Sequence, residues 1–321
     1  MIDEFLQLLK KINGKEIFHQ YARAHVLFFA MLLTLLLGFS RKSLEIVRLA
    51  VSNRILCRLR KKYRRFIAQY KATEDLNLSH THANILWVCW LQGMEAAPDI
   101  VQYCYQSLLT HIKDKEIRLL TEKNYRDYVS FPRHIQKKID THVISRTHMS
   151  DLLRLELLNR YGGTWIDATV FCSGGYIPEY MLNADLFLFQ DLKPGLDGHC
   201  TCISSWFMTA CTDHPILRLT SALLYEYWKV NTKMVDYFLF HCFFQLAIEA
   251  YPEHWNQVIP FSNAIPHILL LRLFEQYDAK IWDALKNMSC FHKLSYKHTA
   301  DQEKKEDTYY NVLFHKEREA S

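Results

Sequence analysis

The sequence lacks several motifs that would assign a function at once. It has 9 glycines in 321 residues and none of them forms a phosphate-binding loop, so a membrane-bound phosphotransferase is a remote interpretation. Its 9 cysteines are an odd number with no pair separated by two residues, and Cys200 and Cys202 lack a matching His/Cys pair at zinc-site spacing. We therefore expect reduced cysteines that pack as small hydrophobic residues, as in a cytoplasmic protein.

Hydrophobic residues, in contrast, are abundant. They make up 50% of the chain and aromatic residues 14%, which allows a large core and excludes global disorder. The length fits one large domain, or one domain with an appendage. Residues 1–71 carry 15 Lys/Arg and 4 Asp/Glu, whereas residues 72–321 carry 24 and 30. A nucleic-acid enzyme more often spreads positive charge over its body, so we expect no nucleic-acid partner.

The N-terminal part combines an apolar run with a basic segment. Residues 24–39 are almost wholly apolar but fall short of the ~20 residues that a membrane span requires. Three interpretations remain: a short span, a monotopic or re-entrant helix, or a helix packed on the protein body. Residues 41–71 contain 11 Lys/Arg and one acid, Glu45, with apolar residues interleaved at helical spacing. This pattern predicts a basic amphipathic helix that binds the inner face of a membrane, with a solvated charged helix as the alternative.

From about residue 84, short apolar runs alternate with helical patterns. We expect strands at 84–93, 116–125, 164–171, 184–192 and 204–210, and helices at 98–111, 151–161, 215–229, 234–250 and 264–287. Ser150 is the expected N-cap of helix 151–161 and Gly162 its stop. Strands that alternate with helices indicate an α/β sandwich with a mostly parallel central sheet.

One strand carries an isolated carboxylate. Alternation along 164–171 places Trp165, Asp167, Thr169 and Phe171 on one face. A carboxylate among apolar residues is costly to bury without a partner, so Asp167 is a candidate ligand-binding residue. A water-exposed edge position is the alternative. Ligands of open α/β sheets gather at the carboxyl ends of the strands, where Asp167 is expected to lie.

The helix before this strand adds two charged residues and a glycine turn. Asp151 and Arg154 are three residues apart and therefore share one helix face. Asp151 could instead stabilise the helix dipole and pair with Arg154. Gly162 and Gly163 allow the chain to reverse into the strand without side chains that would obstruct a ligand.

The stretch SDLLRLELLNRYGGTWIDATVF, residues 150–171, resembles the capsular polysaccharide synthesis protein family, bacterial glycosyltransferases allied to glycosyltransferase family 32. The similarity extends to 86–107, 204–217, 236–241 and 292–297. It implies a GT-A-type nucleotide-sugar-binding domain over residues 76–300. Residues 1–75 would be an N-terminal hydrophobic and basic helical segment, and 301–321 a polar tail.

The resemblance also implies roles for individual residues. Trp90 would stack on the nucleotide base, Asp151 and Arg154 would hold the donor near its phosphates, and Gly163 would lie in the same donor-binding turn. Asp167 would be the first carboxylate of an Asp-x-Asp element.

Thr169 replaces the second carboxylate of that element. A divalent cation, Mn²⁺ or Mg²⁺, would therefore be held weakly or differently at Asp167 and Thr169. His292 is a candidate third metal ligand, with an ordinary surface histidine as the alternative, and Lys293 is a candidate to meet the diphosphate. Asp236 is a candidate to orient acceptor or sugar, with helix capping as the alternative.

These implications lead to a glycosyltransferase, of hexosyltransferase type, that works at the inner face of the cell membrane. It would move a sugar from a nucleotide-sugar donor to a lipid-linked or growing capsule polysaccharide, with retention of configuration implied by the resemblance. The alternative is a catalytically inactive homologue that acts as a binding or scaffolding subunit.

Overall fold

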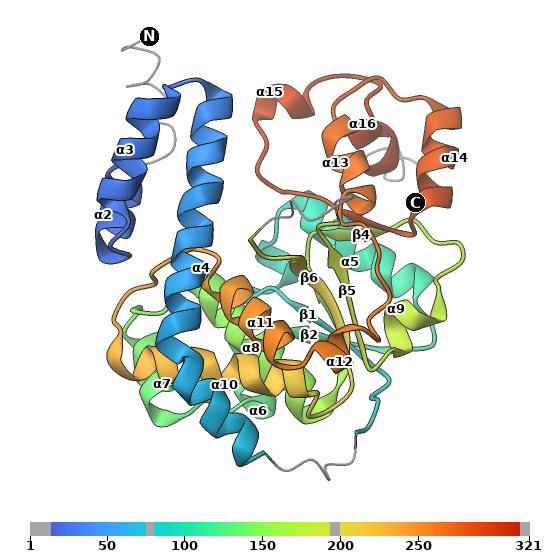
Figure 1. Ribbon diagram of the computed structural model, residues 1–321. Helices are drawn as coiled ribbons and strands as arrows, with labels where there is room; N and C mark the ends of the chain where they lie inside the picture. The colour runs from blue at the N-terminus through green and yellow to red at the C-terminus, as the bar shows by residue number, and fades with distance from the viewer. Residues whose placement is uncertain (1–13, 75–79, 193–199, 315–321) are drawn as a thin grey trace.

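A five-stranded sheet lies at the centre of the molecule, with helices on both faces (Figure 1). The structure, a computed structural model, describes residues 14–74, 80–192 and 200–314. The sheet has the order β2-β1-β3-β6-β5. Its strands are β1 Ile85–Cys89, β2 Glu116–Leu120, β3 Gly163–Asp167, β5 Leu186–Gln190 and β6 Ile203–Ala210.

Most strands of this sheet run in one direction. β1 pairs in parallel with both β2 and β3, and β6 pairs antiparallel with both β3 and β5. The reversed strand is therefore β6. This arrangement confirms the predicted α/β class with a mostly parallel sheet.

Two hydrophobic cores form because side chains alternate between the two faces of the sheet. Trp87 and Trp165 belong to the core shared with three long helices, α8 Arg146–Tyr161, α10 Pro215–Val230 and α11 Leu239–Ala250. Val88 and Ile166 belong to the opposite core, which includes residues of α5 Asp99–His111 and α9 Glu179–Asn183. The sheet is thus covered on both sides, and its carboxyl edge is left for a site.

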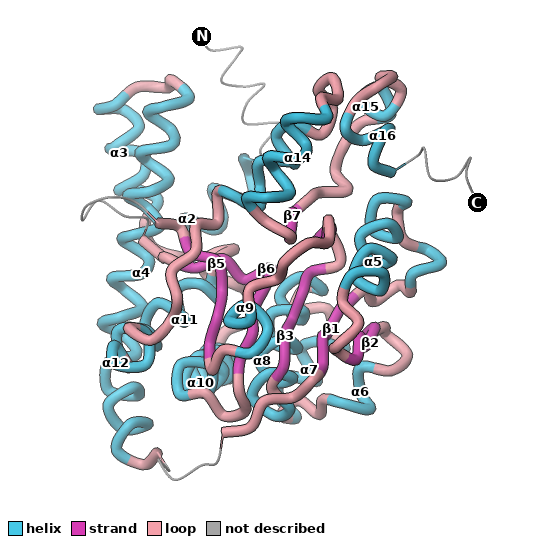
Figure 2. The backbone as a smooth tube through the Cα atoms, turned by 90° about the vertical axis from the view of Figure 1, so that its right-hand side faces the viewer, coloured by secondary structure: helices cyan, strands magenta, loops and turns pink. Residues whose placement is uncertain are grey.

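Shorter elements complete the fold around the sheet (Figures 1 and 2). They are η1 Met94–Ala96, α6 Tyr125–Tyr128, α7 Arg133–Asp140, α12 Pro252–Trp255, η2 Ile265–His267, α13 Ile268–Arg272, α14 Ala279–Met288, α15 Ala300–Glu303 and α16 Tyr309–Phe314. Within the segment predicted as a polar tail, Tyr309, Tyr310 and Phe314 of α16 are buried in the second core. The division of the chain at residues 75 and 300 stays a prediction.

The predicted strand 164–171 is two strands. β3 ends at Asp167, the chain turns at residues 168–169, and β4 Val170–Cys172 pairs antiparallel with β7 Phe291–Lys293 in a separate two-stranded sheet. The predicted alternation therefore holds only up to Asp167. The turn carries Thr169 away from the central sheet and places it beside the end of β7.

Three helix boundaries also differ from the prediction. α8 begins at Arg146, because Ser145 rather than Ser150 is its N-cap and accepts a hydrogen bond from the backbone N of His148 at 3.2 Å. The predicted helix 264–287 is interrupted, since Asp278 caps a new helix, α14. The predicted helix 234–250 begins only at Leu239.

The N-terminal part forms α2 Gly14–Arg23, α3 Leu27–Leu37 and α4 Arg41–Ala72, which confirms a long helix over the basic segment. α3 and the first half of α4 form an antiparallel hairpin, and the second half of α4 lies along α11 and α10 (Figure 1). Across the described residues, none of the helices combines the length and the apolar character that crossing a lipid bilayer would require.

Candidate functional site

The candidate site lies at the carboxyl edge of β1 and β3. The parallel register pairs Cys89 with Asp167, the last residues of these strands. Trp90 follows immediately at the same edge. In an open α/β sheet this edge is where ligands bind.

Arg154 joins the two acids that the sequence singled out. Its Nη2 donates a hydrogen bond to Asp167 Oδ1 at 3.2 Å, and its Nη1 lies 3.4 Å from Asp151 Oδ1. The side chain is only 5% exposed, and its guanidinium carbon lies 5.0 Å from the centroid of the Trp165 ring. Among the described residues the buried Nε has no hydrogen-bond acceptor and Nη1 has only its ion-pair contact with Asp151, so the hydrogen-bonding capacity of Arg154 is not fully used.

Asp167 is held between two cations. Trp165 Nε1 donates to its Oδ1 at 3.0 Å, beside Arg154, and Lys293 Nζ lies 3.5 Å from its Oδ2. Lys293 also donates a hydrogen bond to Thr169 Oγ1. Asp167 is thus a partly exposed carboxylate, with a side chain 29% accessible, whose charge is balanced by two cations.

A buried histidine, His148, holds the carboxylate of Asp151 in place by a hydrogen bond. Trp228 Nε1 donates to His148 Nε2 at 3.0 Å, so the neutral ring carries its proton on Nδ1 and donates it to Asp151 Oδ2 at 3.3 Å. Burial by itself would raise the pKa of Asp151. The hydrogen bond from His148 and the charge of Arg154 outweigh it and hold this pKa below its usual value.

Of the three residues expected to hold a metal, Asp167 and Thr169 lie together at Lys293, and His292 faces away from them. His292 is 1% exposed and bonds Ser173 Oγ at 3.0 Å, and burial lowers its pKa to about 4. Its neighbour Lys293 points to Asp167 instead, because successive side chains of a strand face opposite ways. Nowhere in residues 14–74, 80–192 and 200–314 do three His, Cys, Asp or Glu side chains gather as a metal site. Binding of a divalent cation thus stays a prediction. The side chains fit a cation poorly, because Arg154 and Lys293 already occupy both oxygens of Asp167.

Gly163 and Asp236 have other surroundings than expected. Gly163 has φ +92°, and a Cβ there would collide with the carbonyl oxygen of Ile85, so this glycine lets β3 approach β1. Asp236 is 7% exposed, accepts a hydrogen bond from the backbone N of Phe238 at 2.7 Å, and has a pKa raised by burial. It makes no hydrogen bond or ion pair with Arg154 or Asp167, which are both in the described part of the chain. Its geometry is that of a turn before α11.

Three aromatic side chains border the site. The Trp90 ring meets Tyr296 edge-on at 5.5 Å, and its buried Nε1 has no acceptor among the described residues. Tyr237 is 60% exposed, and its pKa is raised by burial and by the charges of Asp151 and Asp167, which shows that it lies near both acids. Tyr237 and Tyr296 were not predicted, because Tyr237 lies in an apolar aromatic run and Tyr296 in a polar stretch, and neither pattern marks a site residue.

His241 is the third unexpected neighbour. Burial lowers its pKa to about 4, as for a histidine of the core. The charges of Asp151 and Arg154 act on it, however, and its buried Nδ1 has no hydrogen-bond partner in the described structure. His241 therefore adds a neutral, unsatisfied polar group beside Arg154.

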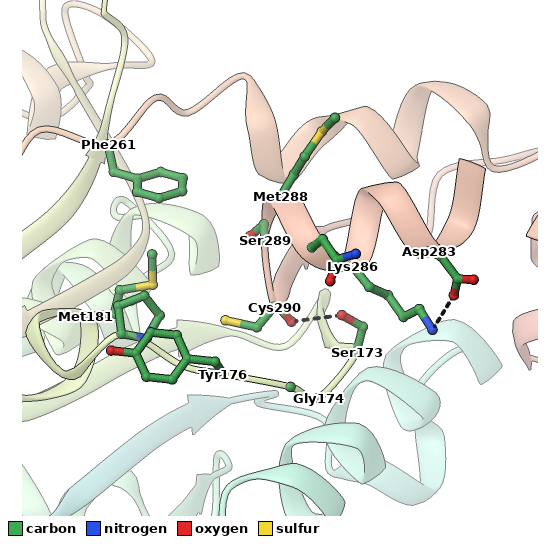
Figure 3. Close-up of a pocket in the computed structure, with 13 residues that line it drawn as sticks. Ser173, Gly174, Tyr176, Met181, Phe261, Asp283, Lys286, Met288, Ser289 and Cys290 are labelled. Atoms are coloured by element: carbon green, nitrogen blue, oxygen red, sulfur yellow. Dashed lines mark hydrogen bonds and ion pairs between the residues drawn. The ribbon is translucent and has the colours of Figure 1, made fainter. Parts of the chain in front are cut away.

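A pocket of about 560 Å³ lies elsewhere, at the end of the β4–β7 pair opposite to Lys293. Figure 3 shows Tyr176, Met181 and Phe261 on one side of it and the Asp283–Lys286 ion pair on the other. Arg154, Asp167 and Lys293 do not line this pocket. Its volume alone assigns it no chemistry, so the charged cluster at the sheet edge remains the candidate site.

Comparison with known proteins gives three results. A solved structure described as PaToxG glycosyltransferase is similar at 13% identity and a TM-score of 0.37, over 81% of this chain and 96% of that one. No protein with a curated description matches the chain. The model of the capsular polysaccharide synthesis protein family matches residues 39–313, which include the whole charged cluster. The chain belongs to the capsular polysaccharide synthesis protein family.

Proposed function

We propose that this protein is a glycosyltransferase of the GT-A type, which moves a hexosyl group from a nucleotide-sugar donor to a saccharide acceptor. The acceptor would be a lipid-linked or growing capsule polysaccharide, in keeping with the family. The observation that carries the proposal is the cluster of Arg154, Asp167 and Lys293 at the carboxyl edge of the sheet, with Trp90 beside it.

The two cations match the charge that this reaction develops. When the bond between sugar and phosphate breaks, negative charge accumulates on the departing diphosphate, and fixed cations near the leaving oxygen lower the barrier. Arg154 offers a buried Nε that has no acceptor among the described residues, and the 18% exposed Lys293 side chain can exchange Asp167 for a phosphate oxygen. Both groups are held in place before the donor arrives, so little reorganisation remains at the moment of reaction.

The acids and aromatic residues would bind the rest of the donor. Asp151, kept ionised by His148 and Arg154, is placed to accept hydrogen bonds from ribose or sugar hydroxyls. Trp90 and Tyr296 offer ring faces and edges for the base or the sugar. No step of this scheme requires a metal held by the protein. Retention of configuration is part of the proposal and rests on the family resemblance.

Slow hydrolysis of the donor tests the proposal without a known acceptor. We expect one member of a UDP- and GDP-sugar panel to raise the thermal midpoint and to release nucleoside diphosphate. Asp167→Ala should abolish the release, whereas Asp140→Asn, at a surface ion pair on α7, should not change it. The anomeric configuration of the released or transferred sugar, read by proton NMR, tests retention.

A catalytically inactive binding subunit is the second candidate. The observation that favours it is Thr169, which offers a neutral hydroxyl where a carboxylate would otherwise hold a metal. Such a subunit would bind a donor or saccharide in the thermal-shift assay but release no diphosphate from any donor, with or without Mn²⁺.

A further inference from the structure

The hairpin of α3 and α4 exposes an apolar surface on the side away from its own packing. Ala30 of α3 is buried, as are Val47 and Val51 of α4. The other side of α3 is exposed: Phe28 is 81%, Leu35 73% and Leu36 72% accessible. Further exposed apolar side chains of the hairpin are Met31, Leu32, Leu37, Ile46 and Leu49. We define these eight residues as the hairpin surface.

Among these residues, those of α3 form a continuous row. Phe28, Leu32 and Leu35 follow one another at intervals of four and three residues, so their side chains lie in a row along α3. Scattered exposed hydrophobic residues are ordinary in proteins, but a contiguous row marks a binding surface.

Positive charge borders the same surface. Arg41, Lys42 and Arg48 are exposed on the first two turns of α4, and the acid among them, Glu45, is paired with Lys42 at 3.1 Å. Arg54 lies over the ring of Phe29, 4.5 Å from its centroid. An apolar row flanked by cations complements a surface that offers acyl chains and phosphate groups together.

The hairpin projects toward the side of the molecule that holds the candidate site. In Figures 1 and 2 the loop between α3 and α4 lies at the same end as α14 and α15, beyond the carboxyl end of β3.

We propose that the hairpin surface docks on an anionic lipid bilayer, with α3 in the plane of the interface and the cations of α4 on the lipid phosphates. The inner face of the cell membrane carries such anionic lipid. The apolar row enters the boundary between headgroups and acyl chains without crossing the bilayer. This inference does not depend on the proposed glycosyltransferase activity, because the hairpin contains none of the residues of that site.

Vesicle flotation of the full-length protein tests the proposal. We expect binding to phosphatidylcholine vesicles that contain roughly 30% phosphatidylserine, and much weaker binding to phosphatidylcholine alone or at high salt. The double variant Leu35→Glu/Leu36→Glu should lower the bound-to-free ratio at least about ten-fold, because each carboxylate would enter an apolar boundary. Lys42→Glu/Arg48→Glu should lower binding to the anionic vesicles and remove its salt dependence.

Leu271→Glu is the matched control. Leu271 is 78% exposed on α13, so this variant carries the same change on an unrelated surface and should bind like the parent protein. Equal flotation of all variants would overturn the proposal. A dimer that forms with rising concentration in light scattering, and that Leu35→Glu/Leu36→Glu dissociates, would also overturn the proposal. The surface would then bind a second copy of the chain. A thermal midpoint of that variant well below that of Leu271→Glu would show that the chain itself covers the surface, and would also refute docking.

Discussion

Replacement of Arg154 by methionine is the most direct test of the charged cluster. Methionine keeps an unbranched side chain of comparable reach but removes the charge that Asp151 and Asp167 share. The side chains of these acids are 15% and 29% exposed, so water compensates them only in part. The variant should therefore lose stability and donor turnover together.

The distances bound the expected loss of stability. Unit charges 3–4 Å apart attract by about 4–5 kcal/mol at an effective dielectric constant of about 20. The desolvation of the buried guanidinium offsets part of this attraction. Asp167 retains Lys293 and Asp151 retains His148, which limits the damage further. We expect the free energy of unfolding to fall by about 2–4 kcal/mol.

A double-mutant cycle with Asp167→Asn isolates the Arg154–Asp167 pair. Asparagine preserves an oxygen that can accept the hydrogen bond from Trp165, so the cycle removes mainly the charge. Urea unfolding at neutral pH should give a coupling free energy of about 1–2 kcal/mol. The same variants should show no measurable release of diphosphate.

The matched control is Arg126→Met. Arg126 pairs with Asp140 at 3.4 Å, but both side chains are more than half exposed, at 56% and 52%. Its loss should change stability by less than about 0.5 kcal/mol. If Arg154→Met behaved like this control, or if the two site variants were additive, the ion pairs would contribute nothing and the interpretation of the site would fail.

Three further predictions follow from the same structure. Lys293→Met should slow diphosphate release about 100-fold. EDTA should change the rate of the parent protein less than about three-fold. If EDTA abolished that rate, the site would be metal-dependent. Stability should fall as the pH drops below about 6.5, by about 1.4 kcal/mol per pH unit for each of His214, His241 and His292, because the unfolded imidazoles bind protons while burial keeps the folded pKa values at about 3, about 4 and about 4. Chemical denaturation at two pH values measures this slope. His214→Gln should lower it by the contribution of one proton, about 1.4 kcal/mol per pH unit. Gly163→Ala should cost about 3 kcal/mol or more in urea unfolding because of the collision with Ile85, whereas Gly175→Ala, at φ +87° in open space, should cost about 1 kcal/mol.

The sequence was sufficient to find the strands of the sheet and the acid at its edge. Runs such as those of β1 and β5 are apolar on both faces, as strands of a covered sheet must be. Asp167 stood out because an ionised group among apolar residues needs a partner. That argument predicts that a partner exists, and Arg154, one helix earlier, is one of them.

Other features could not be predicted because they depend on contacts between distant segments. Lys293 reaches Thr169 across 124 positions of the sequence, and no local pattern indicates that β7 would pair with β4. Ser145 and Ser150 are equally good caps by residue type. In the structure Ser145 is the cap, and its helix places His148 against Trp228.

Under the proposed function, the charges of the site explain how a chain without the second carboxylate would bind a diphosphate. Asp151 and Asp167 balance Arg154 and Lys293, so the four groups together carry no net charge. An additional acid at position 169 would hold Lys293 more tightly and make its transfer to a phosphate oxygen less favourable. Thr169 offers only a neutral acceptor, so Lys293 is oriented by its hydroxyl without being neutralised by it. The departure from the Asp-x-Asp pattern is therefore consistent with a site in which side-chain cations, rather than a tightly bound metal, meet the leaving group.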